Sequence, residues 1–185
     1  MVIFTERDAE NFLKKKGFNI IKTIFIKRDS ELDKLNFKGN FIMKVSSKKI
    51  VHKTKVNGIK KNIKSLKQAK KAFKKLMRIK NAQGVLIQKQ ISGKEYLVGL
   101  KKTKDFGYVI GFGLGGSRVE KKKKVDFRVC GVKGVEDLTK NVSVRKVLDK
   151  LCRLAESQKA IKALDINPLI LGKDKAFIVD SQIVF

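Results

Sequence analysis

His52 is the only histidine in this 185-residue chain, and it lies in the segment KVSSKKIVHKT, residues 44–54. An imidazole titrates near neutral pH and can act as a nucleophile, so His52 could accept a phosphoryl group and pass it on. It could equally be a pH-sensitive surface residue or a satisfied core residue. Spacing alone does not separate these interpretations.

Two further features could bind an anion. Lys44 ends an apolar run, and a lysine leaving a buried strand either extends to solvent, which is favoured for an isolated case, or holds an anion. Gly113, Gly115 and Gly116 form a glycine-rich stretch whose backbone N–H groups could approach a phosphate. The stretch matches neither the Walker nor the dinucleotide fingerprint, and a tight turn explains it about as well.

The segment LDINPL, residues 164–169, carries Asp165 and Asn167 two positions apart, so both point to one face of a strand. An antiparallel return of the chain can bring Asp180 beside them. Two carboxylates and an amide oxygen are hard ligands that suit Mg²⁺ held together with phosphates. The alternative is a surface hairpin with ordinary polar residues.

Hydrophobic periodicity predicts the elements that must position these residues. Helices are expected over residues 5–17, from residue 29, over 65–80 and over 144–155, and strands over 20–26, 41–45, 85–91, 95–100, 108–112 and 125–130. Residues 163–171 and 176–185 are expected to form an antiparallel hairpin. The predicted fold class is mixed α/β (α+β), with two sheet-bearing halves that meet near residues 88–93.

The composition favours a folded domain, because 42% of the residues are hydrophobic. Cys130 and Cys152 are not a C-x-x-C pair and, with one histidine, cannot form a four-ligand soft metal site, so we expect buried reduced thiols. No charged-then-apolar leader opens the chain and no apolar run reaches membrane-spanning length. We therefore expect a cytoplasmic protein without a membrane partner.

The net charge of +28 suggests a polyanionic partner. Lysines nevertheless occur throughout the chain, as a general lysine bias would place them. Most of the twelve phenylalanines stand inside apolar runs, so we expect them in the core and not on a base-stacking surface. The sequence therefore does not favour nucleic acid as the partner.

Taken together, these segments resemble the ATP-grasp β subunit, or β domain, of ADP-forming acetyl-CoA and acyl-CoA synthetases, relatives of succinyl-CoA synthetase. The resemblance covers nearly the whole chain. It is most specific in FIMKVSSKKIVHKTKVNGI, GVLIQKQISGKEYLVGLKKTKDFG, VIGFGLGGSRVE followed by VDFRV, and LDINPLIL with AFIVDSQI. The order and approximate spacing of all four segments agree with the family.

The resemblance implies that Lys44 contacts the phosphates of ATP and that His52 is transiently phosphorylated. It implies that the backbone of residues 88–90 borders the adenine. The other implied positions are the adenine-side residues Gln88, Lys89 and Gln90, Glu95 near the ribose, the Mg²⁺ ligands Asn167 and Asp180 with Asp165 close by, and the loop or phosphate positions Gly58, Gly113, Gly115, Gly116, Glu120 and Arg128.

The resemblance also implies an ATP-grasp fold over residues 1–185. Its small subdomain would be residues 21–88, with the histidine loop, and its metal-binding subdomain residues 89–185 joined by 1–20, with the nucleotide cleft between them. The implied activity is that of an acid–thiol ligase that interconverts acyl-CoA, ADP and phosphate with acid, CoA and ATP. The implied cofactors are Mg²⁺ and ATP/ADP, and the implied partner is a CoA-binding α subunit.

Two alternatives stay open at this point. One is a shortened ATP-grasp remnant that binds nucleotide or RNA without turnover, and the other is an ATP-grasp ligase that uses an acylphosphate and no histidine. The segment CGVKGVEDLTKN, residues 130–141, is shorter than the family's usual stretch, and Asn57 stands where the family usually has glycine.

Overall fold

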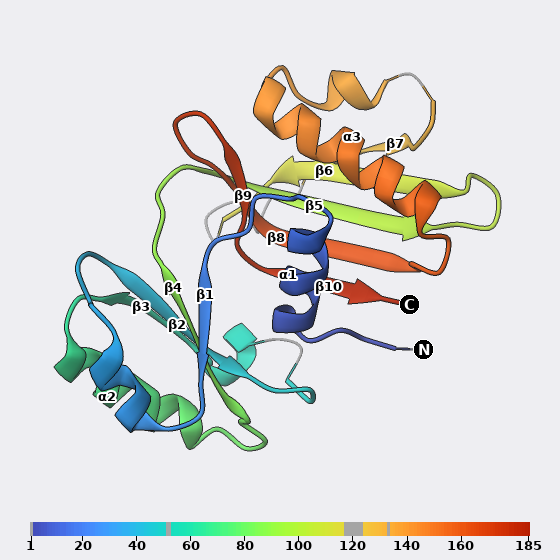
Figure 1. The fold of residues 1–185 in the computed structure, drawn as a ribbon. Coiled ribbons are helices and arrows are strands. Elements are labelled where there is room, and N and C mark those ends of the chain that lie inside the picture. Colours follow the sequence, from blue (N-terminus) through green and yellow to red (C-terminus); the bar gives the residue numbers. More distant parts are fainter. Residues whose placement is uncertain (1, 51–52, 117–123, 133) are drawn as a thin grey trace. The chain divides into compact units, whose positions relative to one another are not determined.

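The computed structural model describes residues 2–50, 53–116, 124–132 and 134–185. It divides into two compact units, one formed by Met1–Ile20 with Ser92–Phe185 and the other by Ile21–Ile91 (Figure 1). Each unit has its own sheet and its own hydrophobic core. The fold is therefore mixed α/β, as the sequence predicts, and the strands of both sheets pair antiparallel.

The Ile21–Ile91 unit contains a four-stranded antiparallel sheet in the order β1-β4-β2-β3. Its elements are β1 (Thr23–Ile26), η1 (Asp29–Lys34), β2 (Phe41–Ser46), η2 (Lys53–Val56), β3 (Ile59–Ile63), α2 (Leu66–Met77) and β4 (Gly84–Lys89). The Ser65 side chain caps α2 by accepting a hydrogen bond from the Gln68 N–H. Met43 and Phe73 belong to one core, so α2 packs on the face of the sheet from which Met43 projects.

The larger unit contains a six-stranded antiparallel sheet in the order β10-β8-β5-β6-β7, with β9 also paired to β8. Its elements are α1 (Glu6–Lys15), β5 (Lys94–Lys102), β6 (Tyr108–Leu114), β7 (Val125–Val129), η4 (Val135–Leu138), α3 (Val142–Ser157), β8 (Ala163–Leu171), β9 (Ala176–Ile178) and β10 (Ser181–Val184). Leu13 of α1 and Leu148 of α3 share one core with Val98 and Ile166 of the sheet.

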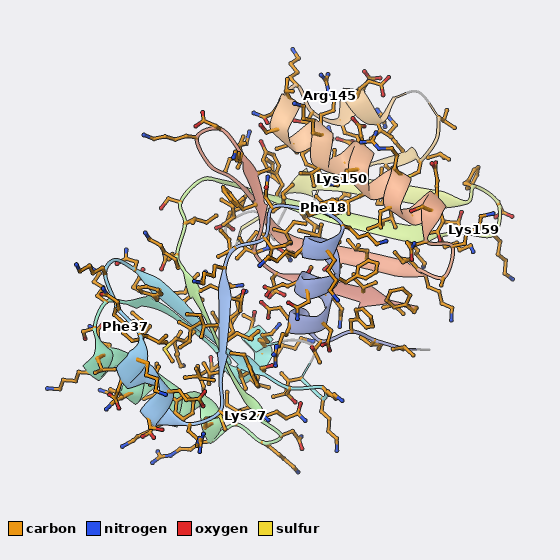
Figure 2. All side chains as sticks on the ribbon, in the orientation of Figure 1. Phe18, Lys27, Phe37, Arg145, Lys150 and Lys159 are labelled. Atoms are coloured by element: carbon orange, nitrogen blue, oxygen red, sulfur yellow. A yellow bond between two sulfur atoms is a disulfide. The ribbon has the colours of Figure 1, made fainter. Side chains whose placement is uncertain are left out.

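The two long helices of this unit are tied together at the end of α1. Gly17 ends α1 with a left-handed backbone, φ +76°. The Lys150 ammonium of α3 donates to the Gly17 carbonyl at 2.6 Å and lies 4.9 Å from the centre of the Phe18 ring (Figure 2). On the sheet, the Tyr108 hydroxyl donates to the Ile161 carbonyl at 2.8 Å, and burial raises the pKa of Tyr108.

Two expectations about the elements were wrong in part. The sequence predicted no strand at 59–63, because Lys60 and Lys61 interrupt the apolar alternation, yet these residues form the edge strand β3. The expected second strand of the final hairpin is split into β9 and β10 at Val179 and Asp180. No helix in the described part of the chain is long and apolar enough to span a bilayer.

The expectation of reduced thiols was also wrong. Cys130, directly after β7, and Cys152 of α3 form a disulfide, with their Cα atoms 5.2 Å apart. The two cysteines are 22 residues apart in the chain, and only the packing of α3 beside the end of β7 brings them within bonding reach.

Candidate functional site

Lys44 lies in the middle of β2, paired with Leu86 of β4 and Ile59 of β3. Side chains alternate along a strand, so Lys44 projects from the face opposite Met43, away from α2. Only 4% of the residue is exposed. Lysines are almost never this buried unless something compensates their charge, and Lys44 does interact with another group of the protein. Its ammonium therefore does not extend to solvent, and it lies on the side of the sheet where an anion could also be held.

The loop after β2 carries His52, but Val51 and His52 lie outside the described residues. Both ends of this loop are held by hydrogen bonds. Before Val51, the Lys48 N–H donates to the Gln83 side chain at 2.9 Å, and after His52 the Gly58 carbonyl accepts a hydrogen bond from the Val45 N–H of β2 at 2.8 Å. The loop therefore leaves and rejoins the sheet at defined points next to the strand of Lys44.

Gly58 has a structural reason to be glycine. A Cβ at this position would lie 2.6 Å from Val45 Cγ1 and 3.0 Å from the Lys53 carbonyl oxygen. The preceding Asn57 adopts a left-handed φ of +52°, which asparagine tolerates better than most residues. This turn closes the loop, which accounts for Gly58 without a phosphate contact.

Gln88 and Gln90 connect β4 to its neighbours. The Gln88 side chain, 1% exposed, donates to the Thr23 hydroxyl at 2.9 Å. The Gln90 N–H donates to the Asn40 carbonyl at 2.7 Å, and the Gln90 side chain accepts from the Asn62 N–H at 3.2 Å. Lys89 is exposed and pairs with Phe41. These bonds fix the end of the strand that the resemblance places beside adenine.

In the larger unit, the register in which β9 and β10 pair with β8 positions Asp180 opposite Asn167. The Asn167 N–H donates to the Asp180 carbonyl at 3.1 Å, and the Val179 N–H donates to the Pro168 carbonyl at 3.2 Å. Asp165 lies two positions before Asn167 on β8, so both project from the same face. We call Asp165, Asn167 and Asp180 the oxygen-donor hairpin.

Asp165 faces a stretch of sheet without large side chains. Its register partner on β5 is Gly99, which pairs in turn with Gly111 of β6. A Cβ on Gly99 would stand 4.0 Å from the Asp165 carboxylate. α1 and α3 pack on the opposite face of the sheet. On the Asp165 face, Gly99 and Gly111 therefore contribute no side chains beside the Asp165 carboxylate.

Phe127 of β7 completes this row and was not singled out from the sequence. It pairs with Gly111, its ring carbon Cε1 would be 2.9 Å from a Cβ there, and 63% of Phe127 is exposed. The expectation that phenylalanines belong in the core therefore fails for Phe127, and also for Phe106, which is 64% exposed. The sequence signal that could have indicated an exposed Phe127 is the alternation of side chains along VDFRV, which forms a strand at the edge of the sheet.

The glycine-rich stretch packs closely on β5. The Gly115 N–H donates to the Glu95 carbonyl at 2.9 Å, and a Cβ on Gly115 would lie 2.9 Å from the Tyr96 carbonyl carbon. Gly116 has a φ of +99° and comes close to the Glu95 carboxylate. Gly113, within β6, would bring a Cβ to 2.7 Å from the Lys124 carbonyl. The structure thus brings Glu95, Gly115 and Gly116 together.

Arg128 does not lie with this group. Arg128 pairs with Ile110, a core residue, so its side chain leaves the sheet on the face opposite Asp165. Its guanidinium donates to the Phe127 carbonyl at 2.8 Å. Glu120 lies outside the described residues.

The oxygen-donor hairpin fits a magnesium ion by its chemistry. Within the described residues, no three histidine, cysteine or acidic side chains gather as a self-contained metal site. Two carboxylates and one amide oxygen are nevertheless the type of partial ligand set that Mg²⁺ accepts when substrate phosphates and water complete its octahedron.

Comparison with known proteins places these features in context. A family model described as an ATP-grasp domain matches residues 2–138. The chain is 32% identical to the ADP-forming acetate–CoA ligase II of Archaeoglobus fulgidus, over 99% of this chain and 30% of that protein. It is 29% identical to the beta subunit of ADP-forming acetate–CoA ligase I of Pyrococcus furiosus, over 97% of this chain and 90% of the subunit.

The fold is also found in a solved structure. It matches dinucleotide-forming acetyl-coenzyme A synthetase 1 of Ca. Korarchaeum cryptofilum with a TM-score of 0.80 and 24% identity, covering 99% of this chain and 92% of that one. That protein is in complex with coenzyme A and Mg-AMPPCP, and its phosphohistidine segment points towards the nucleotide-binding site. The chain spans less than a third of the Archaeoglobus protein's length and most of the Pyrococcus subunit's.

Proposed function

Since this chain belongs to the ATP-grasp domain family and is similar to ADP-forming acetate–CoA ligases, we propose that it is the β subunit of an ADP-forming acyl-CoA synthetase. The family predicted from the sequence motifs is thereby confirmed. The observation that carries the proposal is the buried Lys44, on the strand that leads directly into the loop of His52.

The proposed reaction at His52 is a phosphoryl transfer. An imidazole nitrogen forms a bond to the γ-phosphorus of ATP, the bond from that phosphorus to the bridging oxygen breaks, and ADP leaves with the electron pair. In the direction of ATP synthesis, ADP attacks phosphohistidine and restores the imidazole. A covalent histidine divides the overall reaction into two transfers that need not occur at one place.

Lys44 supplies positive charge to the phosphates during this transfer. Phosphoryl transfer depends on positioning and on charge stabilisation, and a buried ammonium acts more strongly than one in water. The oxygen-donor hairpin would hold Mg²⁺, which when bound neutralises phosphate charge. The backbone of residues 88–90 would border the adenine, and Glu95 would lie near the ribose.

The second transfer requires a partner that this chain does not contain. We propose that this partner is a CoA-binding α subunit, and that His52 carries the phosphoryl group between the α subunit and ADP. We also propose that both subunits are in the cytoplasm. The name of the Pyrococcus relative, a beta subunit, supports this division. The net charge of +28 also favours the approach of ATP, CoA and phosphate, all of which are anionic.

Incubation of the chain with [γ-³²P]ATP and Mg²⁺ tests the proposal. We expect protein-bound label that is lost in acid and retained in base, as a phosphoramidate bond requires, and no label on His52→Asn. Measuring ATP binding of both proteins in parallel shows that the variant is folded. Label retained on His52→Asn would overturn the role of His52, and ATP binding without any label on the wild type would favour the remnant without turnover.

A further inference from the structure

The positive charge of this protein is concentrated in one of its two units. The Ile21–Ile91 unit has 21 lysine and arginine residues and three acidic ones, a net charge of +18 out of +28 for the chain. The larger unit carries the remaining +10. No Asp or Glu occurs from residue 34 to residue 94. A uniform lysine bias would instead place most of the charge on the longer part of the chain.

Helix α2 presents this charge as one continuous face. Its buried side is Ala69, Ala72, Phe73 and Leu76. Its exposed side carries Lys67, Lys71, Lys74 and Lys75, which we call the α2 lysine face. In the region of α2, side chains tipped with nitrogen extend outward from the ribbon (Figure 2). Lys64, Arg78 and Lys80 extend the exposed positive charge beyond both ends of α2.

The charge on this face is not neutralised by the protein's own acidic residues. Lys70 forms an ion pair with Asp33 at 2.7 Å, at the margin of the face. Across the described residues, the side chains of the four lysines of the face make no hydrogen bond or ion pair. Lys67 with Lys71 and Lys71 with Lys75 are like charges one turn apart, an arrangement that destabilises a helix. Contacts within the described part of the protein therefore do not explain why these four lysines lie side by side.

Its geometry matches a phosphate backbone better than a base edge. The 12 residues of α2 span about 18 Å, and lysines one turn apart lie about 5–6 Å from each other. A nucleic-acid duplex offers one negative charge for about every 1.7 Å of its axis, so several ammonium groups can meet phosphates at once. Lysine is a point charge without the planar fork that reads guanine, and no aromatic ring stands on the face to stack a base.

We propose that the α2 lysine face binds the phosphate backbone of double-stranded nucleic acid without sequence preference. A membrane surface is disfavoured as the partner because the apolar side of α2 is buried in the core and cannot insert into lipid. The face is also separate from Lys44, which projects from the other side of the same sheet. Binding of a duplex and phosphorylation of His52 can therefore be tested independently.

The test compares two sets of four lysine-to-glutamine substitutions with equal loss of charge. One set is Lys67, Lys71, Lys74 and Lys75, and the control set consists of exposed lysines of the larger unit, Lys14, Lys15, Lys104 and Lys140. Glutamine has a helix propensity close to that of lysine, so α2 is retained. Binding to a labelled, mixed-sequence DNA duplex and an RNA duplex is measured by fluorescence anisotropy over a range of salt concentrations.

We expect the α2 set to weaken duplex binding roughly 100-fold or more at about 0.1 M salt, and to make the plot of log K against log salt shallower by about 3. The control set is expected to change affinity by less than about 10-fold, with a similar slope. Equal losses from the two sets would overturn the proposal, since the charge would then act diffusely. Tighter binding to anionic lipid vesicles than to duplex would overturn it in favour of a membrane.

Discussion

The oxygen-donor hairpin follows from the register of the pairing along β8. Leu169 pairs with Ile178 of β9 and Ile166 pairs with Ser181 of β10, so one continuous register sets Asp180 opposite Asn167. The Asp180 carbonyl accepts a hydrogen bond from the Asn167 N–H. The backbone thus places a carboxylate-bearing residue beside an amide-bearing one. Magnesium binding at this hairpin can be tested one side chain at a time.

We expect Asp180→Ala to weaken Mg²⁺-dependent ATP binding by roughly 10-fold or more, because one carboxylate oxygen donor is lost. Isothermal titration with ATP in the presence and absence of Mg²⁺ measures the effect. Asp174→Ala is the matched control, since Asp174 is exposed on the same hairpin and only its backbone carbonyl is engaged, with Ser143. An unchanged Kd for Asp180→Ala would remove the hairpin from the proposed site.

Among the elements, α3 and β7 are joined by the disulfide that the sequence did not predict. β7 is the edge strand of its sheet and most of its residues are exposed, so it is paired with a neighbouring strand on one side only. The covalent bond from Cys130 to Cys152 links the end of this strand to a helix whose inner side is buried in the core. The bond therefore holds the end of the edge strand beside α3.

Cys152→Ser is expected to lower the free energy of unfolding by about 3 kcal/mol, because the disulfide closes a loop of 22 residues and restricts the unfolded chain. Urea denaturation monitored by circular dichroism measures the difference. Wild type in excess reductant should match the variant. Two titratable thiols in denatured wild type kept without reductant would show that the bond does not form, as would a wild type unaffected by reductant.

On the scale of the whole molecule, the uneven charge has a cost in stability. The lysines of the α2 lysine face repel one another, and the same repulsion acts through the +18 of their unit. This repulsion between exposed charges becomes weaker as the salt concentration rises, because salt screens it. The stability of this protein should therefore depend on ionic strength more than that of a balanced chain.

The glutamine set at Lys67, Lys71, Lys74 and Lys75 is expected to raise the free energy of unfolding by about 1 kcal/mol at low salt, since each like-charge pair removed contributes about 0.2–0.5 kcal/mol. Thermal unfolding at low and high salt should show the gain shrinking as salt is added. The Lys14, Lys15, Lys104 and Lys140 set serves as control. If the α2 set were no more stable than wild type, repulsion along the helix would not be the cause.

Much of this molecule could be predicted from local pattern. The apolar spacing of Leu66 to Met77 and of Val144 to Ala155 predicted α2 and α3, because a helical period is visible in any amphipathic segment. Most strands followed from apolar runs, and the order of four motifs indicated the family that the comparisons confirm. β3 was missed because an edge strand with Lys60 and Lys61 has little apolar alternation.

What the sequence determined by itself is therefore the class of elements, the family and the residue types able to handle phosphate. Only the tertiary structure decided that Lys44 is buried, that Cys130 meets Cys152 and that Phe127 is exposed over Gly111. It also showed that most of the net positive charge belongs to one unit. The physical reason is that periodicity is a local property, whereas burial, pairing and charge density depend on which distant segments pack together.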